Sequence, residues 1–214
     1  MDVLNQIDHF FSGYPKRSYP KGQILVFAGE KPTHIFYIKR GRVRKYDVSY
    51  RGDEVIVNVF KPPAFFEVDW ALNHTFNKYF FKTETSSDFH IAPLNDINKL
   101  LNDNPKVTLD LIKRVYRGVE GIQGRLVHLM SGTAKSRLIY EILIECKRFS
   151  NIEEDGSYKL DITEADIAAR TGLSRETVSR ELQSIKKEGI IKSSSRGVIV
   201  KDIKILENKI NHVF

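Results

Sequence analysis

The hydrophobic pattern of the chain changes at Pro93. Between residues 21 and 60, β-branched and aromatic residues are frequent and glycines interrupt them, which is typical of short antiparallel strands. Residues 80–92 predict a further strand, and a turn over residues 51–54 precedes a strand with alternating apolar residues, Val55, Val57 and Val59. A jelly roll closes this many strands without exposed edges, so we expect an N-terminal antiparallel β jelly roll.

After Pro93 the apolar residues follow a helical period. Residues 94–101 predict a short helix, and Pro105 opens a long helix that continues to about Met130. Its apolar positions are spaced alternately by three and four residues and form a heptad seam: Ile112, Val115, Val119, Ile122, Leu126 and Leu129. One helix cannot bury such a seam alone. The seam packs against the β domain of the same chain or, as we predict, pairs with a second subunit in a two-stranded coiled coil.

Three glycines, Gly118, Gly121 and Gly124, lie inside this long helix. Each should cost about 1 kcal/mol relative to alanine. One hypothesis is that a ligand of the β domain or a loop approaches the helix closely there. The alternative is a tolerated local weakness. A second helix is predicted over residues 135–149.

Residues 162–191 predict a helix-turn-helix. Thr163 is placed to cap the first helix, and Asp166 completes a capping box three residues later. Gly172 suits the positive φ of a helix end, and Ser174 offers an oxygen to cap the next helix. A turn of about three residues between two helices is helix-turn-helix spacing.

The second of these helices has one apolar and one polar face. Val178, Leu182 and Ile185 recur at i, i+4 and i+7 and should be buried. Arginine can make a bidentate contact to guanine, and glutamate can accept from the cytosine amino group. The opposite polar arc therefore predicts DNA base reading by Arg175, Glu176, Ser179 and Arg180. The alternative is a solvated helix face in a three-helix bundle.

A polar turn between two short apolar runs follows this helix, at residues 193–197, and predicts a hairpin or wing. Residues 170–201 carry eight bases and three acids, so +5 of the chain's formal +7 lies here, as an electrostatic footprint on phosphate requires. We predict DNA phosphate contacts by Thr163, Ser174, Thr177, Gln183, Lys187, Ser193 and Arg196.

Composition narrows the class of protein. The 214 residues favour two domains, and the pI near 9.3 fits an acidic partner. Cys146 is the only cysteine, so one chain can form neither an internal disulfide nor a cysteine-ligated iron–sulfur cluster. No signal-peptide pattern and no apolar stretch of membrane-spanning length is present, so we expect a cytoplasmic protein without a membrane partner.

The order of roll, long helix and winged helix-turn-helix resembles the Crp/Fnr family of bacterial transcription regulators. Two segments carry the resemblance, which covers nearly the whole chain: KGQILVFAGEKPTHIFYIKRGRVRKY at residues 21–46 is similar to the opening strands of the family's cyclic-nucleotide-binding-like roll, and LSRETVSREL at residues 173–182 is similar to its recognition helix. The family's base-reading positions fall on the four residues already chosen from the polar arc. RNA polymerase is a partner implied by the resemblance.

The nucleotide pocket departs from this family's pattern. Members that bind cyclic AMP present a glutamate to the ribose and an Arg-Ser pair to the phosphate, whereas alignment places Val68 at the glutamate and Lys78 and Tyr79 at the pair. Valine cannot accept a hydrogen bond, and lysine lacks the planar fork of arginine. We therefore do not expect control by cyclic AMP. If an effector pocket exists, its candidate residues are Phe66, Glu67, Trp70, Lys78, Tyr79, Ile122 and Gln123.

Other sensing chemistry finds little support. His74, His90 and His128 could in principle ligate haem, but the histidines lack metal-ligand spacing. We expect no cofactor, no metal and no catalytic residue. Lys78 either serves another anion or extends into solvent. The following aromatic residues line an apolar ligand cavity or, as we favour, fill the core of the roll: Phe65, Phe66, Trp70, Phe76, Tyr79, Phe80 and Phe81.

The sequence thus predicts an α+β protein. Residues 1–104 would form the β-roll sensor domain, 105–132 the dimerisation helix and 133–214 the winged helix-turn-helix domain, with a boundary near residues 131–133. The expected function is a homodimeric regulator that binds a pseudo-palindromic operator and answers to another small effector or is constitutively DNA-competent. The alternatives are a cupin-like jelly-roll enzyme or a ligand sensor with an accessory C-terminal domain.

Overall fold

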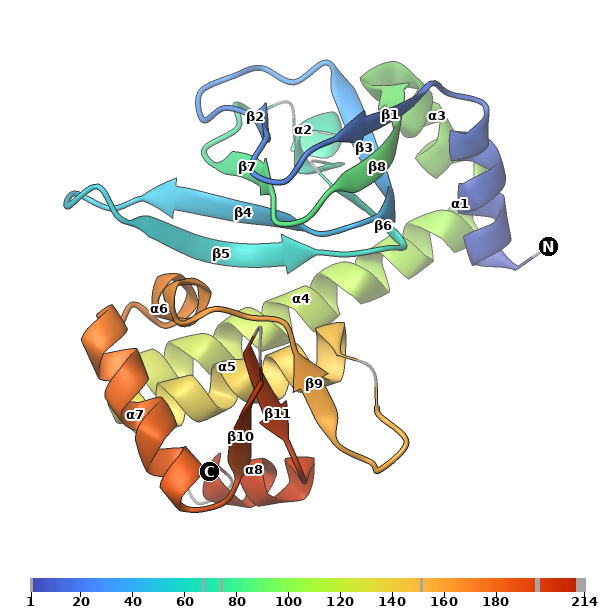
Figure 1. Cartoon of the computed structure of the whole chain (residues 1–214). Coiled ribbons are helices and arrows are strands. Elements are labelled where there is room, and N and C mark those ends of the chain that lie inside the picture. The colour runs from blue at the N-terminus through green and yellow to red at the C-terminus, as the bar shows by residue number, and fades with distance from the viewer. Residues whose placement is uncertain (1, 67, 74, 151, 195–196, 211–214) are drawn as a thin grey trace. The chain divides into compact units, whose positions relative to one another are not determined.

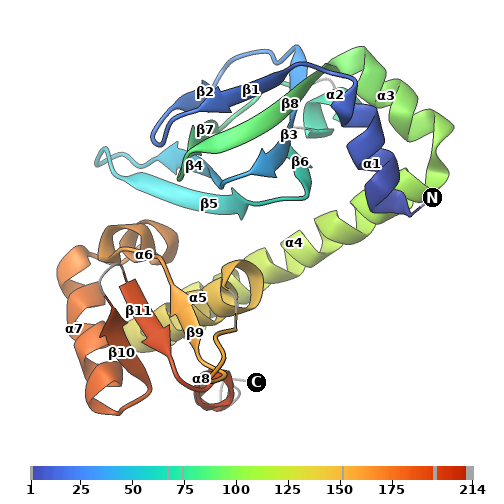
Figure 2. The ribbon, with the colours of Figure 1, turned by 45° about the vertical axis from the view of Figure 1, so that its right-hand side comes forward.

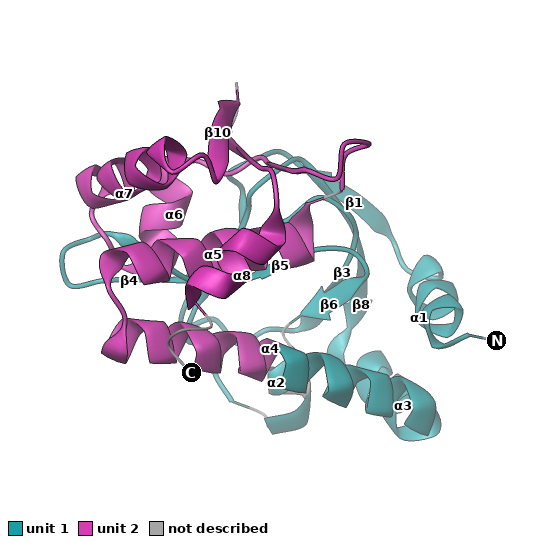
Figure 3. Cartoon of the chain, turned by 90° about the horizontal axis from the view of Figure 1, so that it is seen from below, with its two compact units in different colours: residues 1–117 teal, residues 118–214 magenta. Residues whose placement is uncertain are grey.

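The computed structural model describes residues 2–66, 68–73, 75–150, 152–194 and 197–210, without the side chains of residues 70 and 71. The chain divides into two compact units, Met1–Arg117 and Gly118–Phe214 (Figure 3). The division falls within one long helix, α4 (Pro105–Ser131). This helix confirms the long helix predicted from Pro105 to about Met130.

Two four-stranded antiparallel sheets form the first unit, with strand orders β1-β8-β3-β6 and β2-β7-β4-β5 (Figure 1, Figure 2). Apolar side chains from both sheets pack between them, which confirms the jelly roll. Besides the start of α4, the elements of this unit are α1 (Val3–Ser12), β1 (Lys16–Tyr19), β2 (Ile24–Val26), β3 (His34–Arg40), β4 (Val43–Val48), β5 (Glu54–Phe60), β6 (Ala64–Phe66), α2 (Val68–Asn73), β7 (Phe80–Thr83), β8 (Ser87–Pro93) and α3 (Leu94–Asp103).

The predicted alternation of Val55, Val57 and Val59 on one face is wrong. Val59 is buried, but Val55 is 41% exposed, and Ile56 takes the neighbouring core position. The cause is a β-bulge, because Lys45 pairs with Asn58 and Tyr46 with Ile56, which leaves Val57 as the extra residue. The extra residue reverses the alternation, so Val55 and Val59, which would share a face in a regular strand, lie on opposite faces of the sheet.

The single strand predicted over residues 80–92 is two strands that belong to different sheets. β7 ends at Thr83 and β8 begins at Ser87, after a short turn. Gly41 explains the tightness of this corner, because its φ is +96° and a Cβ there would lie 2.1 Å from the Ser87 hydroxyl oxygen. The pattern also left α1, β1, β6, α2, β9 and α8 unpredicted.

The second unit surrounds α5 with helices and a three-stranded sheet of order β10-β11-β9 (Figure 1). Its elements, besides the end of α4, are α5 (Ala134–Phe149), β9 (Tyr158–Leu160), α6 (Glu164–Thr171), α7 (Arg175–Lys187), β10 (Ile191–Ser194), β11 (Gly197–Val200) and α8 (Ile203–Ile210). The antiparallel β10–β11 pair is the predicted wing. α6 and α7 are the predicted helix-turn-helix.

The helix ends agree with the sequence in detail. Thr163 and Asp166 form the predicted capping box of α6, and Gly172 closes α6 with φ +67°. Ser174 caps α7 by accepting from the backbone N–H of Thr177 at 3.2 Å. The turn between the two helices is therefore fixed at both of its ends.

Of the three glycines in α4, only Gly124 makes close room for another group. A Cβ on Gly124 would lie 1.9 Å from Oη of Tyr140, whereas one on Gly118 or Gly121 would meet nothing within 4 Å. The Tyr140 hydroxyl also donates to the carbonyl of Gly121 at 3.3 Å. The group that approaches the helix closely at Gly124 is thus a side chain of α5.

Candidate nucleic-acid interface

The polar face of α7 faces away from the core of its unit. Val178, Leu182 and Ile185 are buried as predicted, which fixes the rotation of the helix about its axis. Four residues were predicted to read bases: Arg175, Glu176 and Arg180 are exposed and Ser179 is half-buried. The helix therefore presents these four side chains together on its outer side.

Two of the arc's charged groups have neighbours that affect them. A hydrogen bond from the Ser174 side chain lowers the pKa of Glu176, so this carboxylate is ionised at neutral pH. Nε of Arg180 lies 3.5 Å from Oε1 of Glu181, and the Arg180 side chain is 70% exposed, so this long contact should contribute little to stability. Arg180 can leave such a pair at small cost to meet another acceptor.

The capping hydroxyls are engaged within the protein. Oγ1 of Thr163 accepts from the Asp166 backbone at 3.1 Å and donates to the Asp166 carboxylate at 2.7 Å. Oγ of Ser174 lies 3.1 Å from Oγ1 of Thr177. The hydroxyls of Thr163 and Ser174 therefore serve mainly to order the N-termini of α6 and α7. The backbone N–H groups of such N-termini favour anions.

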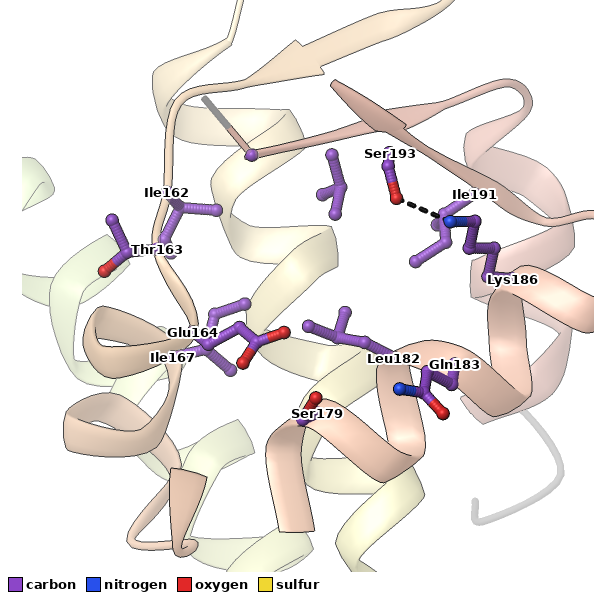
Figure 4. Close-up of a pocket in the computed structure, with 12 residues that line it drawn as sticks. Ile162, Thr163, Glu164, Ile167, Ser179, Leu182, Gln183, Lys186, Ile191 and Ser193 are labelled. Atoms are coloured by element: carbon purple, nitrogen blue, oxygen red, sulfur yellow. Dashed lines mark hydrogen bonds between the residues drawn. The ribbon is translucent and has the colours of Figure 1, made fainter. Parts of the chain in front are cut away.

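A groove of about 460 Å³ lies between the start of α6, the face of α7 and the wing (Figure 4). Ser179, Gln183 and Lys186 enter it from α7, and Nζ of Lys186 donates to Oγ of Ser193 on β10 at 2.8 Å. The other lining residues are Ile162, Thr163, Glu164, Ile167, Leu182, Ile191, Gly197 and Val198. The groove is open, polar along α7 and apolar at its floor.

Lys186 and Glu164 belong to this groove but were not among the predicted site residues. The signal for Lys186 was present, because positions 179, 183 and 186 are spaced at i, i+4 and i+7 and share one helix face. Glu164 is the first residue of α6, and its place in the groove depends on how α6 meets the wing. No local pattern in the sequence reports that arrangement.

The basic count over residues 170–201 includes one arginine that does not face outward. Arg170 is buried, with Nη1 2.7 Å from Oε2 of Glu145, so it neutralises a buried carboxylate and adds little to the external field. The positive charge that residues 170–201 present to the outside is therefore smaller than the count of eight bases and three acids suggests. Arg196, predicted to contact phosphate, lies outside the described residues. The exposed bases of the described part of this stretch are Arg175, Arg180, Lys186, Lys187, Lys192 and Lys201.

The candidate effector residues of the first unit differ in their surroundings. Phe66 is buried in the roll, with its ring stacked on Phe36 at 5.5 Å and on Phe81 at 5.2 Å between centroids. Lys78 is exposed, and the ring of Tyr79 lies 4.6 Å from Nζ of Lys45. Glu67 and the side chain of Trp70 lie outside the described structure.

Ile122 and Gln123 are exposed on the part of α4 that belongs to the second unit. Core packing is correct for Phe65, Phe66 and Phe81, whereas Phe76 is exposed.

The histidines offered for haem have other surroundings. Nδ1 of His90 lies 2.8 Å from the carbonyl of Tyr14, and the ring of His128 packs on Tyr140 with centroids 4.6 Å apart. His74 lies outside the described residues. Within the described part of the chain, no group of three histidine, cysteine, aspartate or glutamate side chains is arranged to hold a metal ion. None of the described helices is long and apolar enough to span a bilayer.

Two family models match this chain. A cyclic nucleotide-binding domain matches residues 16–104 and a Crp-like helix-turn-helix domain matches residues 136–209. The chain is 25% identical to the anaerobic regulatory protein of Pasteurella multocida over 94% of its own length and 72% of that protein. It is 21% identical to the cAMP-activated global transcriptional regulator CRP of Haemophilus influenzae, over 91% of this chain and 87% of that protein.

A solved structure has the same fold. The c-di-GMP responsive global regulator CLP of Xanthomonas campestris superposes with a TM-score of 0.79 at 15% sequence identity, over 92% of this chain and 99% of that one.

Proposed function

The chain belongs to the Crp/Fnr family of transcription regulators, and on this premise we propose that it acts as a homodimer on a pseudo-palindromic DNA operator. The family's members and fold neighbours are regulators and not enzymes, which removes the cupin-type alternative. The observation that supports the proposal most strongly is the outward polar face of α7, which lies beside the groove that ends at the wing. The three segments 1–104, 105–132 and 133–214 would then sense, dimerise and bind DNA.

α7 is the proposed recognition helix. Arg175, Glu176, Ser179 and Arg180 would reach base edges in the major groove, because they share the exposed arc of the first turns of the helix. The proposed phosphate contacts surround this arc: Thr163, Ser174, Thr177, Gln183, Lys187, Ser193 and Arg196. Lys186 joins them, since its ammonium group lies in the same groove as Gln183 and Ser193.

The exposed seam of α4 supports the dimer. Its six residues, Ile112, Val115, Val119, Ile122, Leu126 and Leu129, are between 39% and 56% exposed in the single chain. α4 also carries half of the eighteen large exposed apolar side chains among the described residues. A heptad seam left open along one helix suits a two-stranded coiled coil. Two copies of α7 would then read half-sites about 34 Å apart, one helical turn of DNA.

Control by cyclic AMP is not part of the proposal. Val68, which stands where the family's cyclic-AMP binders carry a glutamate, is buried, and stacked phenylalanines fill the space between the sheets of the roll. Two of the similar proteins are named for different nucleotides, cAMP and c-di-GMP, so similarity does not transfer an effector. The chain would answer to another effector or be constitutively DNA-competent, in the cytoplasm and with RNA polymerase as its family partner.

The test of base reading starts with in vitro selection of duplexes bound by the full-length protein. Arg180→Ala should weaken binding to the selected operator by about 1–3 kcal/mol and change binding to random duplex little. Lys187→Ala is the matched control at a proposed phosphate contact, and it should weaken both and reduce the salt slope. Equal losses on both duplexes for Arg180→Ala would exclude a base-reading role.

The test of the dimer is a single charge in the seam. Leu126→Asp places a carboxylate where two helices would meet, so the variant should sediment as a monomer at concentrations at which the parent is a dimer. Arg117→Asp is the control, since it changes charge on the opposite side of the same helix. A parent that sediments as a monomer would contradict the coiled coil.

A further inference from the structure

Two buried carboxylates on α5 each bind an arginine from a different helix. Glu141 and Glu145 lie one helical turn apart. Arg125 of α4 binds Glu141 with two nitrogens, Nε on Oε1 and Nη2 3.1 Å from Oε2. Arg170 of α6 places Nη1 2.7 Å from Oε2 of Glu145, and these two side chains are 2% and 0% exposed. We call these four residues the charge clamp.

The charge clamp is poorly explained by stability alone. Replacing both members of a buried ion pair by apolar residues of similar size is often neutral or stabilising, because the pair must overcome the loss of hydration of two charges. Removal of one partner is costly for the same reason. An arginine–carboxylate pair restricts the relative orientation of the two helices that carry it, because a planar guanidinium binds a carboxylate in a narrow range of orientations. Apolar contacts are non-directional and impose no such restriction.

The two ion pairs lie where they can fix the orientation of α4 and α6 relative to α5. One pair joins α5 to the end of α4, and the other joins α5 to the last turn of α6, two residues before Gly172. Gly172 and the Ser174 cap then lead directly into α7. Arg148 is half-buried and shares this face of α5 with Glu141 and Glu145, at i+7 and i+3. Burial and then the charges of Arg125 and Arg170 lower its pKa.

We propose that the charge clamp positions α7 relative to the end of α4. On the proposed function, on which this inference rests, it sets the spacing between the two half-sites that the dimer accepts. Moving one half-site by one base pair both translates it and rotates it by about a tenth of a helical turn. A recognition helix held in one orientation should reject such operators, and a loosely held one should tolerate them.

The experiment measures dissociation constants of the full-length protein for three duplexes: the selected operator and two operators with the half-site spacing changed by one base pair in either direction. The main variant combines Glu145→Leu with Arg170→Met, so that neither member of this buried pair remains without the other. It should fold and dimerise like the parent and bind random DNA equally well. Its preference for the selected spacing should fall by about tenfold, which corresponds to about 1.4 kcal/mol.

The controls separate the clamp from a structural role and from the proposed function. Lys147→Gln with Glu207→Gln removes an exposed ion pair that also begins on α5, with Nζ 2.6 Å from Oε1, and should leave the spacing preference unchanged. If the parent does not prefer its operator to random DNA, the proposed function fails. If it does, an unchanged spacing preference in the double variant overturns the clamp. Should that variant not fold, Arg170→Lys keeps the charge without the fork, and an unchanged preference there overturns it equally.

Discussion

Substitution of the α4 glycines by alanine should have opposite effects at two positions one turn apart. Alanine gains about 1 kcal/mol over glycine inside a helix. A Cβ on Gly121 meets nothing within 4 Å, so Gly121→Ala should raise the free energy of unfolding by about that amount. A Cβ on Gly124 would lie 1.9 Å from Oη and 2.5 Å from Cζ of Tyr140, so the ring or α5 must move.

The cost at Gly124 can be estimated from that clash. Gly124 and Tyr140 are half-buried, and overpacking of a close contact costs about 1–3 kcal/mol, which cancels or exceeds the helical gain. Displacement of the Tyr140 ring also weakens its hydrogen bond to the carbonyl of Gly121, a loss of about 0.5–1.5 kcal/mol. Gly124→Ala should therefore be less stable than Gly121→Ala by about 1.5–4.5 kcal/mol.

The assay is urea unfolding followed by circular dichroism at one fixed protein concentration, because the stability of a dimer depends on concentration. The single tryptophan lies in the first unit, so its fluorescence is a poor probe of this contact. A Tyr140→Leu background removes the ring, and Gly124→Ala should be less harmful there than in the parent. If both alanine variants gain equal stability, the close contact of Tyr140 with α4 is wrong.

Two further predictions concern helix ends in the DNA-binding unit. Lys135, and then Lys209, lower the pKa of Glu188 from 4.5 to about 2, so the carboxylate contributes stability that is present above about pH 4.5 and is lost as the pH falls towards 2. In acid titrations of thermal stability, the difference between the parent and Glu188→Gln should close across that window; a constant difference would contradict the pairing. Thr163→Ala should destabilise α6 by about 0.5–2 kcal/mol because it removes the cap, and Thr163→Ser should not, as amide hydrogen exchange along α6 would report.

The DNA-facing half of the molecule was largely predictable because its determinants are local. The capping box, the left-handed Gly172 and the Ser174 cap each involve residues at most three apart, and the buried face of α7 follows from one helical period. The wing required only a polar turn between two apolar runs. Such features act within one or two turns of chain, which is the range that a single sequence reports reliably.

The β roll was predictable as a class but less so in register. The run from Phe80 to Ala92 contains a polar stretch at residues 83–88 that is a turn signal, but the geometry of the corner depends on the approach of Gly41 to Ser87 from another part of the chain. The bulge at Val57 likewise depends on the pairing partner, β4. Tertiary contacts decide both, and they override the local strand pattern.

Arg170 shows how a helical pattern could have corrected the charge argument. A count of basic residues in the sequence includes Arg170 in the positive charge of residues 170–201. However, Arg170 lies three residues after the buried Ile167 and so shares the core face of α6. Glu145 stands in the same way between Ile144 and Cys146, in a helix that is buried on most sides. Opposite charges at core positions of successive helices predict a buried ion pair, because neither charge is tolerated there alone. The external charge of a helix-turn-helix should therefore be counted only after its core positions have been assigned.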